Sequence, residues 1–374
     1  MSEALEDRPR GVGLYVHWPY CARICPYCDF NVVRARGREA EGARLGEAML
    51  ADLEAQAALI GPRPLASIFF GGGTPSLMPP QLAARIIARA RGLFPGGGEV
   101  EVTLEANPTD AETARYAAFA EAGINRLSLG LQSLDDEALK FLGRDHSAAE
   151  GVRAVRAGQA VFGRVSIDLI YARPGQGEQD WREELARAID LGPEHVSPYQ
   201  LTIEPRTAFG RAFARGMLRP PGEDAAADLY EATQAGLEAA GFEAYEVSNH
   251  ARGVAARSAH NLHVWRGGDY LGLGPGAHGR LTLDGVRTAT VAYRAVADYA
   301  AGVGTGRPWS EREPLSPRDA AEERLLLGLR TVDGAPMWLL ATLGLSVAAS
   351  PAVDLMATAR GRPVLDGVLR ALLT

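Results

Sequence analysis

Short apolar runs rich in β-branched residues alternate with longer amphipathic stretches over the first two hundred residues of the chain. This alternation is typical of repeated βα units, in which parallel strands form one sheet and helices cover it. The predicted strands are Gly13–His17, Leu65–Phe70, Glu99–Leu104, Arg126–Gly130, Arg164–Ile170 and His195–Ile203. The predicted helices are Arg38–Ile60, Pro80–Arg91, Asp110–Ala122, Asp135–Ala160 with a break near Gly143, and Gln179–Asp190. Six such units are too few to close an eight-stranded barrel. The pattern therefore favours an α/β fold with a partial, open TIM-like (β/α)6 barrel, and a doubly wound sheet is the alternative.

The pattern changes after Pro221, where the alternation of strands and helices ends. A helix is predicted at Glu223–Ala240, and the stretch Gly241–Leu283 is rich in glycine, histidine and aromatic residues. From Ser316 onward the chain is helical and rich in leucine and alanine, and Gly302–Pro314 is predicted as the linker before it. We therefore expect a core barrel at 1–221, a barrel-capping region at 222–302 and a small, mainly helical C-terminal domain at 303–374.

Charge and hydropathy argue against two classes of partner. The chain has 39 Lys and Arg against 46 Asp and Glu, and its net charge of -7 argues against a nucleic-acid or anionic-membrane surface. No secretory signal is visible in the first residues. The best membrane candidate, Met337–Ala349, is short and interrupted by polar residues, so we expect a buried helix there and no membrane insertion.

Only three cysteines occur, Cys21, Cys25 and Cys28, and all lie within eight residues. An odd number in one short segment is not a disulfide framework, and it indicates a reducing compartment, the cytoplasm. The C-x3-C-x2-C spacing after the first predicted strand favours an iron–sulfur cluster with one iron left open to bind a small molecule. The alternatives are a zinc site completed by a histidine such as His17, and thiols that bind nothing.

Polar residues lie at the ends of the other predicted strands. The glycine run Gly71–Thr74 follows the second strand, Glu105 ends the third and Gln132 ends the fourth. Because the carboxyl ends of parallel strands meet at one edge of a sheet, we expect these residues to lie close together. Glycine amides and carbonyls at such a turn suit the carboxylate and amino groups of a ligand.

Asp168 is an acid inside an otherwise apolar predicted strand. Burying it without a partner would be costly, so it either faces a ligand or has an ionic partner. A ribose hydroxyl or an ammonium group would suit it as a ligand. The alternative is an ion pair inside the barrel, with Arg144 or Arg126.

Taken together, these motifs resemble those of the radical S-adenosylmethionine superfamily and, within it, the HemW heme chaperones. The resembling segments follow one another in order over residues 12–280. They are Tyr15–Cys21 (YVHWPYC), Pro26–Asn31 (PYCDFN), Gly71–Ser76 (GGGTPS), Glu105–Pro108 (EANP), Gly130–Ser133 (GLQS) and His260–Trp265 (HNLHVW). The resemblance implies a radical S-adenosylmethionine barrel.

The resemblance also implies roles for individual residues. Cys21, Cys25 and Cys28 would hold a [4Fe–4S] cluster, and the amino and carboxylate groups of S-adenosylmethionine would chelate its open iron. Tyr27 matches an aromatic residue that packs beside the cluster. The residues that match the S-adenosylmethionine sites of the family are Tyr15, Gly72, Gly73, Thr74, Glu105, Gln132, Arg144 and Asp168.

Departures from the family patterns bear on the activity. The sequence also resembles oxygen-independent coproporphyrinogen III oxidase, HemN, whose pattern has a fourth cysteine two residues after the third. Phe30 stands at that position here, which favours the chaperone over the radical oxidative decarboxylation of porphyrin biosynthesis. Ala172-Arg173-Pro174 replaces the usual Gly-Leu-Pro, and Val264 replaces the tyrosine of an H-N-x-x-Y-W motif.

Four of the seven histidines lie within 29 residues, beside aromatic residues and glycines: His250, His260, His263 and His278. Heme needs an axial imidazole, apolar walls and arginines for its propionates. The resemblance links the His260–Trp265 motif to heme, and we predict His260 as the ligand; the alternative is a structural histidine, which we favour for His250 and His263.

The function implied by the resemblance is a heme chaperone. Such a protein would bind heme, a [4Fe–4S] cluster and S-adenosylmethionine, and would deliver heme to apo-hemoproteins. S-adenosylmethionine would either be cleaved to a radical or regulate the cluster. The oxidase is the alternative within the family, and a zinc-stabilised barrel of unrelated activity is the alternative outside it.

Overall fold

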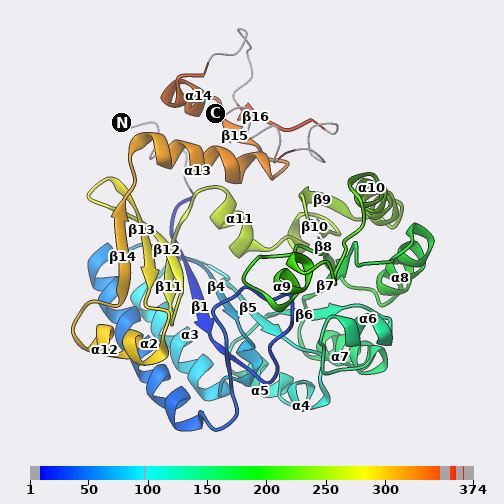
Figure 1. Ribbon diagram of the computed structural model, residues 1–374. Helices are drawn as coiled ribbons and strands as arrows, with labels where there is room; N and C mark the ends of the chain where they lie inside the picture. The colour runs from blue at the N-terminus through cyan, green and yellow to red at the C-terminus, as the bar shows by residue number, and fades with distance from the viewer. Residues whose placement is uncertain (1–8, 97, 346–353, 359–364, 366–374) are drawn as a thin grey trace.

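The computed structural model of the protein describes residues 9–96, 98–345, 354–358 and 365, and its centre is a curved parallel sheet (Figure 1). The six predicted strands are all present and are neighbours in chain order, each parallel to the next. They are β1 (Val12–Trp18), β4 (Leu65–Gly72), β5 (Glu101–Ala106), β6 (Arg126–Gln132), β7 (Val165–Tyr171) and β8 (His195–Gln200). The predicted α/β fold is therefore confirmed.

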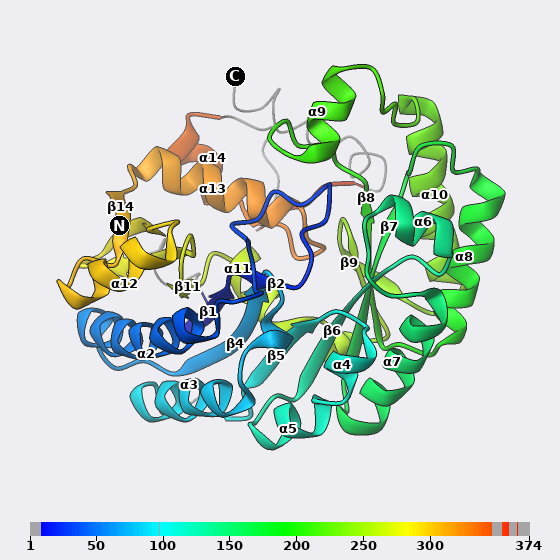
Figure 2. The same ribbon diagram turned by 60° about the horizontal axis from the view of Figure 1, so that its bottom comes forward.

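Helices cover the outer, convex face of this sheet (Figure 2). They are α2 (Glu39–Ile60), α3 (Pro80–Leu93), α4 (Asp110–Thr113), α5 (Tyr116–Glu121), α6 (Asp136–Phe141), α7 (Ala148–Val161) and α8 (Glu178–Asp190). The predicted break near Gly143 separates α6 from α7, and a Ser147–Glu150 capping box starts α7. The helix predicted at Asp110–Ala122 is instead two short helices, because the chain turns at 114–115.

The sheet continues past both ends of the six-stranded core without closing. Beside β1 lies the parallel strand β11 (Asp269–Leu273), followed by antiparallel strands β12 (His278–Leu283), β13 (Val286–Ala292) and β14 (Trp309–Pro314). Beyond β8 lie the antiparallel strands β10 (Asn249–Ala251) and β9 (Glu243–Glu246). β14 and β9 are the two edges of the described sheet, so the barrel is open, as predicted.

The prediction that Gly302–Pro314 is a linker is wrong, because the segment is mostly helix and strand. This segment contains the end of α12 (Val296–Gly304) and the whole of β14, which pairs with β13. Helix α9 (Ala208–Ala214) lies near the end of the predicted core segment. The remaining elements of the capping region are α10 (Glu223–Ala239), the single turn η2 (Val254–Ala256) and α11 (Ala259–Trp265).

The two faces of the core strands differ in polarity, as the period of two in a strand requires. Buried aliphatic residues such as Leu14, Ile68 and Leu104 face the helices and form the main hydrophobic core. The residues between them face the lumen of the barrel, and many are polar, including Glu105, Ser128 and Asp168. The apolar face stabilises the barrel, and the polar face leaves the lumen suited to a ligand.

The C-terminal part lies over α11 in Figure 1 and has a small hydrophobic cluster of its own. Its described elements are α13 (Pro317–Leu329), β15 (Ala335–Pro336), α14 (Trp338–Leu343) and β16 (Asp354–Leu355). Ion pairs from Arg330 to Glu246 and from Arg266 to Asp333, both 2.6 Å, attach this part to the barrel.

The membrane candidate Met337–Ala349 contains α14, and its last four residues lie outside the described part of the chain. Within the described residues, no helix is both long and apolar enough to cross a membrane.

Candidate functional site

The cysteines lie in a loop at the carboxyl end of β1, between the two-residue strands β2 (Tyr20–Cys21) and β3 (Val33–Arg34). These strands pair in parallel, and backbone hydrogen bonds from Val33 to Pro19 and from Ala35 to Cys21 close the base of the loop. Within the loop, the amide of Cys28 donates to the carbonyl of Cys25. The loop is therefore anchored at both ends while its cysteines stay free of other secondary structure.

One cavity of about 510 Å³ brings together all the predicted site residues except Tyr15 and His260. It extends from the cysteine loop to the carboxyl ends of β4 to β7. The predicted residues that line it are Cys21, Cys25, Tyr27, Cys28, Gly72, Gly73, Thr74, Glu105, Gln132, Arg144 and Asp168. The expectation that strand ends bring these side chains together is therefore met.

The glycine run after β4 leaves room beside the cysteines. A Cβ atom at Gly73 would lie 2.9 Å from the sulfur of Cys21 and 2.9 Å from the carbonyl of Pro19. Gly72 has φ of +108°, and a Cβ there would lie 2.6 Å from Nδ1 of His17. Both positions therefore require glycine, and the backbone can approach a ligand bound against the thiols.

Burial favours the protonated form of the thiols, and a nearby positive charge favours the thiolate. Burial raises the pKa of Cys21 to about 11 and raises the pKa of Cys28 above its ordinary value. Arg144 donates from Nη1 to the sulfur of Cys25 across 3.4 Å. Because thiolates are the form that ligates iron, bound iron would supply the positive charge that favours ionisation of Cys21 and Cys28.

A single metal ion and a cluster make different demands on the metal-ligating side chains of the loop. In the described part of the chain, no group of three or more His, Cys, Asp or Glu side chains is arranged to hold one metal ion. Both ring nitrogens of His17 are used, Nε2 by the carbonyl of Asn31 at 2.9 Å and Nδ1 by the hydroxyl of Tyr15 at 3.0 Å. In a [4Fe–4S] cluster each thiolate binds a different iron, so the three sulfurs need not converge on one point.

Two carboxyl groups face the cavity next to the glycine run. Burial, together with the charge of Asp168, raises the pKa of Glu105 to about 8. Burial raises the pKa of Asp168 to about 6, opposed by hydrogen bonds from Ser197 and Ser128. Among the described residues Asp168 forms no ion pair, so the alternative of a barrel salt bridge is not what the structure has. A cationic ligand such as a sulfonium or ammonium group would stabilise both carboxylates.

The backbone of Gln132 is strained at this site, and hydrogen bonds hold the side chain of Arg144 there. Gln132 has φ of 63°, a left-handed conformation that is uncommon outside glycine and often marks functional positions. Arg144 donates to the carbonyl of Gly130 at 2.9 Å and also to the side chain of Asn107. It thereby connects β6, the loop after β5 and the cysteine loop.

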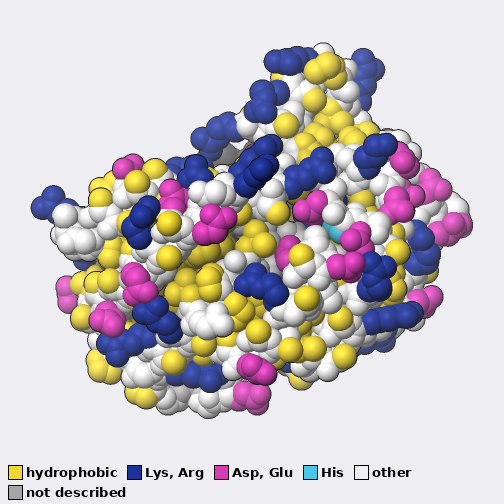
Figure 3. Space-filling view, turned by 90° about the horizontal axis from the view of Figure 1, so that it is seen from below, with side chains coloured by type: hydrophobic (Ala, Val, Ile, Leu, Met, Phe, Trp, Pro, Cys, Tyr) yellow, Lys and Arg dark blue, Asp and Glu magenta, His cyan; other side chains and the backbone are white. Residues whose placement is uncertain are grey.

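A second cavity, of about 600 Å³, fills the lumen of the barrel and contains the two remaining predicted residues, Tyr15 and His260. It adjoins the first cavity, because Phe30, Gly72, Glu105, Ser128 and Asp168 are among the residues that line both. Figure 3 views the molecule from below and shows apolar side chains gathered near the centre of this face, with charged side chains mostly around them.

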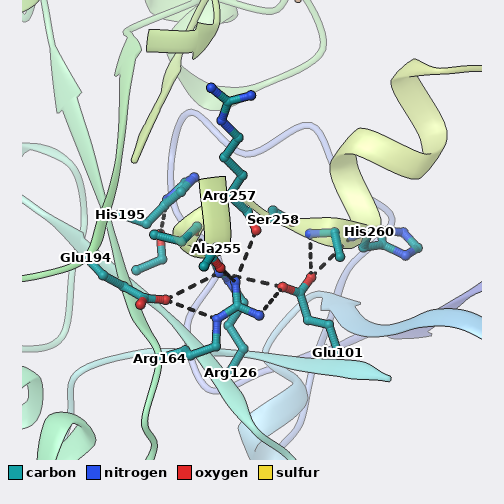
Figure 4. A network of polar contacts seen from close by, with 12 residues as sticks. Glu101, Arg126, Arg164, Glu194, His195, Ala255, Arg257, Ser258 and His260 are labelled. Atoms are coloured by element: carbon teal, nitrogen blue, oxygen red, sulfur yellow. Dashed lines mark hydrogen bonds and ion pairs between the residues drawn. The ribbon is translucent and has the colours of Figure 1, made fainter. Parts of the chain in front are cut away.

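His260 lies at the opposite end of the barrel from the cysteines. Its Nδ1 contacts the hydroxyl of Ser67 at 2.8 Å, its ring stacks on Phe69, and burial lowers its pKa to about 3. Its backbone amide donates to Glu101 at the start of β5 (Figure 4). The heme-ligand role of His260 stays a prediction. The contacts with Ser67, Phe69 and Glu101 support the alternative, which is a structural role.

The departures from the family pattern have clear structural outcomes. Ala172 has φ of 56°, in the region that favours glycine, which is the residue usual at this position. Arg173 forms a buried ion pair with Glu184. Val264 lines the lumen cavity where the motif has tyrosine.

Sequence reasoning missed the hydroxyl and amide groups on the inner face of the barrel. Lumen-lining residues of this kind are Thr103, Ser128, Ser166, Ser197, Tyr199, Asn249 and Asn261. The signal was present: in β5 to β8 most alternate residues are polar, which is the pattern of a strand with one polar face. Asn31 was also missed as an anchor, although it ends one of the motifs.

Known proteins match the chain over most of its length. A family model described as "Radical SAM superfamily" matches residues 15–188. "Heme chaperone HemW" of Escherichia coli is 36% identical over 87% of this chain and 84% of its own length, and that of Mycobacterium tuberculosis H37Rv is 36% identical over 96% and 94%. "Radical S-adenosyl methionine domain-containing protein 1, mitochondrial" of Bos taurus is 42% identical over 85% and 73%.

A solved structure matches the whole fold. It is that of coproporphyrinogen III oxidase (HemN) from Escherichia coli, which superposes with a TM-score of 0.80 over 100% of this chain and 92% of that chain. The two sequences are 20% identical, so this likeness concerns the fold alone. From the relatives and the barrel together, the chain belongs to the radical S-adenosylmethionine superfamily and, within it, to the HemW family.

Proposed function

We propose that the protein is a heme chaperone, which holds a [4Fe–4S] cluster and S-adenosylmethionine at one end of the barrel and carries heme next to them. The observation that supports this most is the contact between the two cavities. The cysteine cavity and the lumen cavity share part of their lining, and Phe30 belongs to both. The lumen cavity, about 600 Å³, has the size of ordinary ligand sites.

In this proposal, Cys21, Cys25 and Cys28 hold the cluster and Tyr27 packs beside it. When bound, the cluster supplies an open iron that chelates the amino and carboxylate groups of S-adenosylmethionine. Glu105 and Asp168 face the cationic and hydroxyl groups of that ligand, and the glycine run lets the backbone approach it. Arg144 is positioned to stabilise the thiolate of Cys25 and to fix the strand that carries Gln132.

Phe30 supports a chaperone over an oxidase. It stands where the oxidase pattern has its fourth cysteine, and its side chain is 60% exposed at the opening of both cavities. An exposed aromatic side chain at a cavity opening suits contact with a flat apolar ligand. The names of the bacterial relatives point the same way. Heme would then pass to apo-hemoproteins, in the cytoplasm.

The test is to load the protein step by step under anaerobic conditions. Reconstitution should give about four irons per chain and a broad absorbance near 400 nm, and zinc in place of iron would contradict the cluster. Addition of hemin should then give a Soret band that saturates at a fixed ratio of heme to chain. A missing Soret shift would contradict the chaperone proposal.

The same preparation separates the chaperone from the oxidase. Incubation with coproporphyrinogen III, a reductant and S-adenosylmethionine should give no protoporphyrinogen. Turnover would contradict the proposal in favour of the oxidase. Transfer of heme to an apo-hemoprotein, followed as loss of the donor spectrum and gain of the acceptor spectrum, tests delivery itself.

A further inference from the structure

We infer that His278, and not the predicted His260, is the axial ligand of the heme, an assignment that rests on the proposed chaperone function. The seven histidines all lie in the described part of the chain, and His278 is the one that is exposed. The other six are at most 6% exposed. A porphyrin needs open space in front of the coordinating nitrogen, and an exposed imidazole at the edge of the cavity offers more of it than a buried one.

The six buried rings are also engaged by neighbours. His17 contacts Tyr15 and the carbonyl of Asn31, and His195 contacts Ser166 and Tyr245. The remaining contacts are His146 to the carbonyl of Leu131, His250 to Gln234, His260 to Ser67 and His263 to the carbonyl of Asp269. His146, His250 and His263 do not line the lumen cavity. Of the three that do, His17 and His195 have both ring nitrogens in hydrogen bonds, and His260 lies at the end of the barrel away from the cluster site.

His278 has neither of these constraints. It begins β12, at the same end of the barrel as the cysteines, and lines the lumen cavity. Among the described residues no hydrogen bond or ion pair engages its ring. Burial and the nearby Arg280 lower its pKa, so the ring is neutral at physiological pH, which is the form that binds a metal.

The surroundings of His278 match the other needs of a heme. Arg294 lines the same cavity, is exposed, and its guanidinium has no ion-pair partner among the described residues, so it is available to a propionate. Arg280 is different, since Glu323 already pairs with it at 2.6 Å. Phe30, Val291 and Tyr270 contribute apolar and aromatic wall to the cavity.

Asn31 fixes these groups relative to the cysteine loop. Its side-chain amide donates to the carbonyl of Pro275 and to the carbonyl of Arg294, both at 2.8 Å. The turn before β12 and the segment after β13 are therefore held against the end of the cysteine loop. Phe30, the neighbour of Asn31 in the chain, lines the same cavity as His278 and Arg294, and the heme would lie next to the cluster site.

The assignment is tested by hemin titration of the full chain, followed by Soret absorbance and resonance Raman spectroscopy. His278→Ala should weaken hemin affinity at least about tenfold and remove the imidazole signature, and added imidazole should restore the spectrum. His278→Tyr should give a phenolate signature instead. Because His278 is exposed, both variants are expected to melt like the wild type.

Two further variants provide controls. Arg294→Ala should weaken hemin affinity while keeping the imidazole signature, whereas Arg307→Ala, an exposed arginine outside the cavity, should change neither. His260→Ala should keep the signature if the chain remains folded.

The two proposals fail separately. If wild-type protein binds hemin and His278→Ala binds it with the same affinity and spectrum, the assignment of His278 is overturned and the chaperone proposal stands. Loss of the signature in a folded His260→Ala would overturn it as well. If the wild type binds no hemin, the chaperone proposal itself fails.

Discussion

Arg144 donates a hydrogen bond to the sulfur of Cys25 from a position 119 residues later in the chain, across 3.4 Å. The same guanidinium donates to the carbonyl of Gly130 and to Asn107. One partly buried side chain therefore holds three separate segments around the cluster site.

We expect Arg144→Met to lose this connection while keeping much of the side-chain volume. The carbonyl of Gly130 and the amide of Asn107 would lose a charged donor, at a cost of about 1–3 kcal/mol in the free energy of unfolding. Iron content after reconstitution should fall, and urea denaturation should show the loss of stability. A variant with full iron content and wild-type stability would show that Arg144 does not hold these segments around the cluster site.

Gly73 and Gly163 form a matched pair of glycines. Gly73→Ala should reduce iron incorporation and S-adenosylmethionine binding, because the new methyl group would lie 2.9 Å from the sulfur of Cys21. At Gly163 a Cβ meets nothing within 4 Å, and its φ is not in the left-handed region, so Gly163→Ala should bind both as the wild type does. Iron analysis measures the first effect and equilibrium dialysis the second. Equal behaviour of the two variants would contradict the need for glycine at position 73.

Glu105 should make the ligand-free protein less stable as pH rises. Its pKa is raised from 4.5 to about 8, so the folded state holds a proton that the unfolded state has already lost. This contribution is fully present below pH 4.5 and disappears as pH rises through about 8. Urea unfolding between about pH 5 and pH 9 should show a flatter pH profile for Glu105→Gln than for the wild type.

The comparison isolates Glu105 because Asp52, Asp168 and Glu112, whose pKa values are also raised by burial, remain in both proteins. Parallel pH profiles would exclude a raised pKa at Glu105. A cationic ligand should also bind more tightly at the high end of this range, with release of protons.

Glu101 should affect stability without affecting the cluster. Its carboxylate pairs with Arg164 at 2.8 Å and accepts from the amides of Ala259 and His260 at the start of α11 (Figure 4). Breaking such a buried arrangement by Glu101→Gln should cost about 3 kcal/mol in the free energy of unfolding. Iron content should stay normal, because Glu101 is at the far end of the barrel.

Glu47→Gln is the control for this prediction. Glu47 pairs with Arg85 on the surface, where an ion pair contributes little, so its unfolding curve should match the wild type. A Glu101→Gln variant that also unfolds like the wild type would show that the network around α11 is not important for stability.

The βα core could be predicted from the sequence because each unit has a local signal. Buried strands such as β4 are mostly apolar, and helices such as α7 begin with a capping box. The site at the strand ends followed from topology, since it needs only that parallel strands share a carboxyl edge. Asp168 was recognised because an acid inside an apolar strand is unusual.

The rest depends on contacts between distant residues. β11 pairs with β1 across more than two hundred residues, and nothing local indicates that pairing. β14 (WSEREP) is an edge strand with charged, exposed side chains, so it reads as a linker. The position of His260 at the amino end also follows from where α11 docks, which no periodicity shows.

The segment from η2 to α11 crosses the amino ends of the strands and is bound there by Arg126, Arg164 and Glu101. The segment therefore covers the lumen at the amino ends of the strands, and the lumen opens at their carboxyl ends. A ligand that enters at the carboxyl end of the strands would pass the cysteine loop before it reaches the lumen.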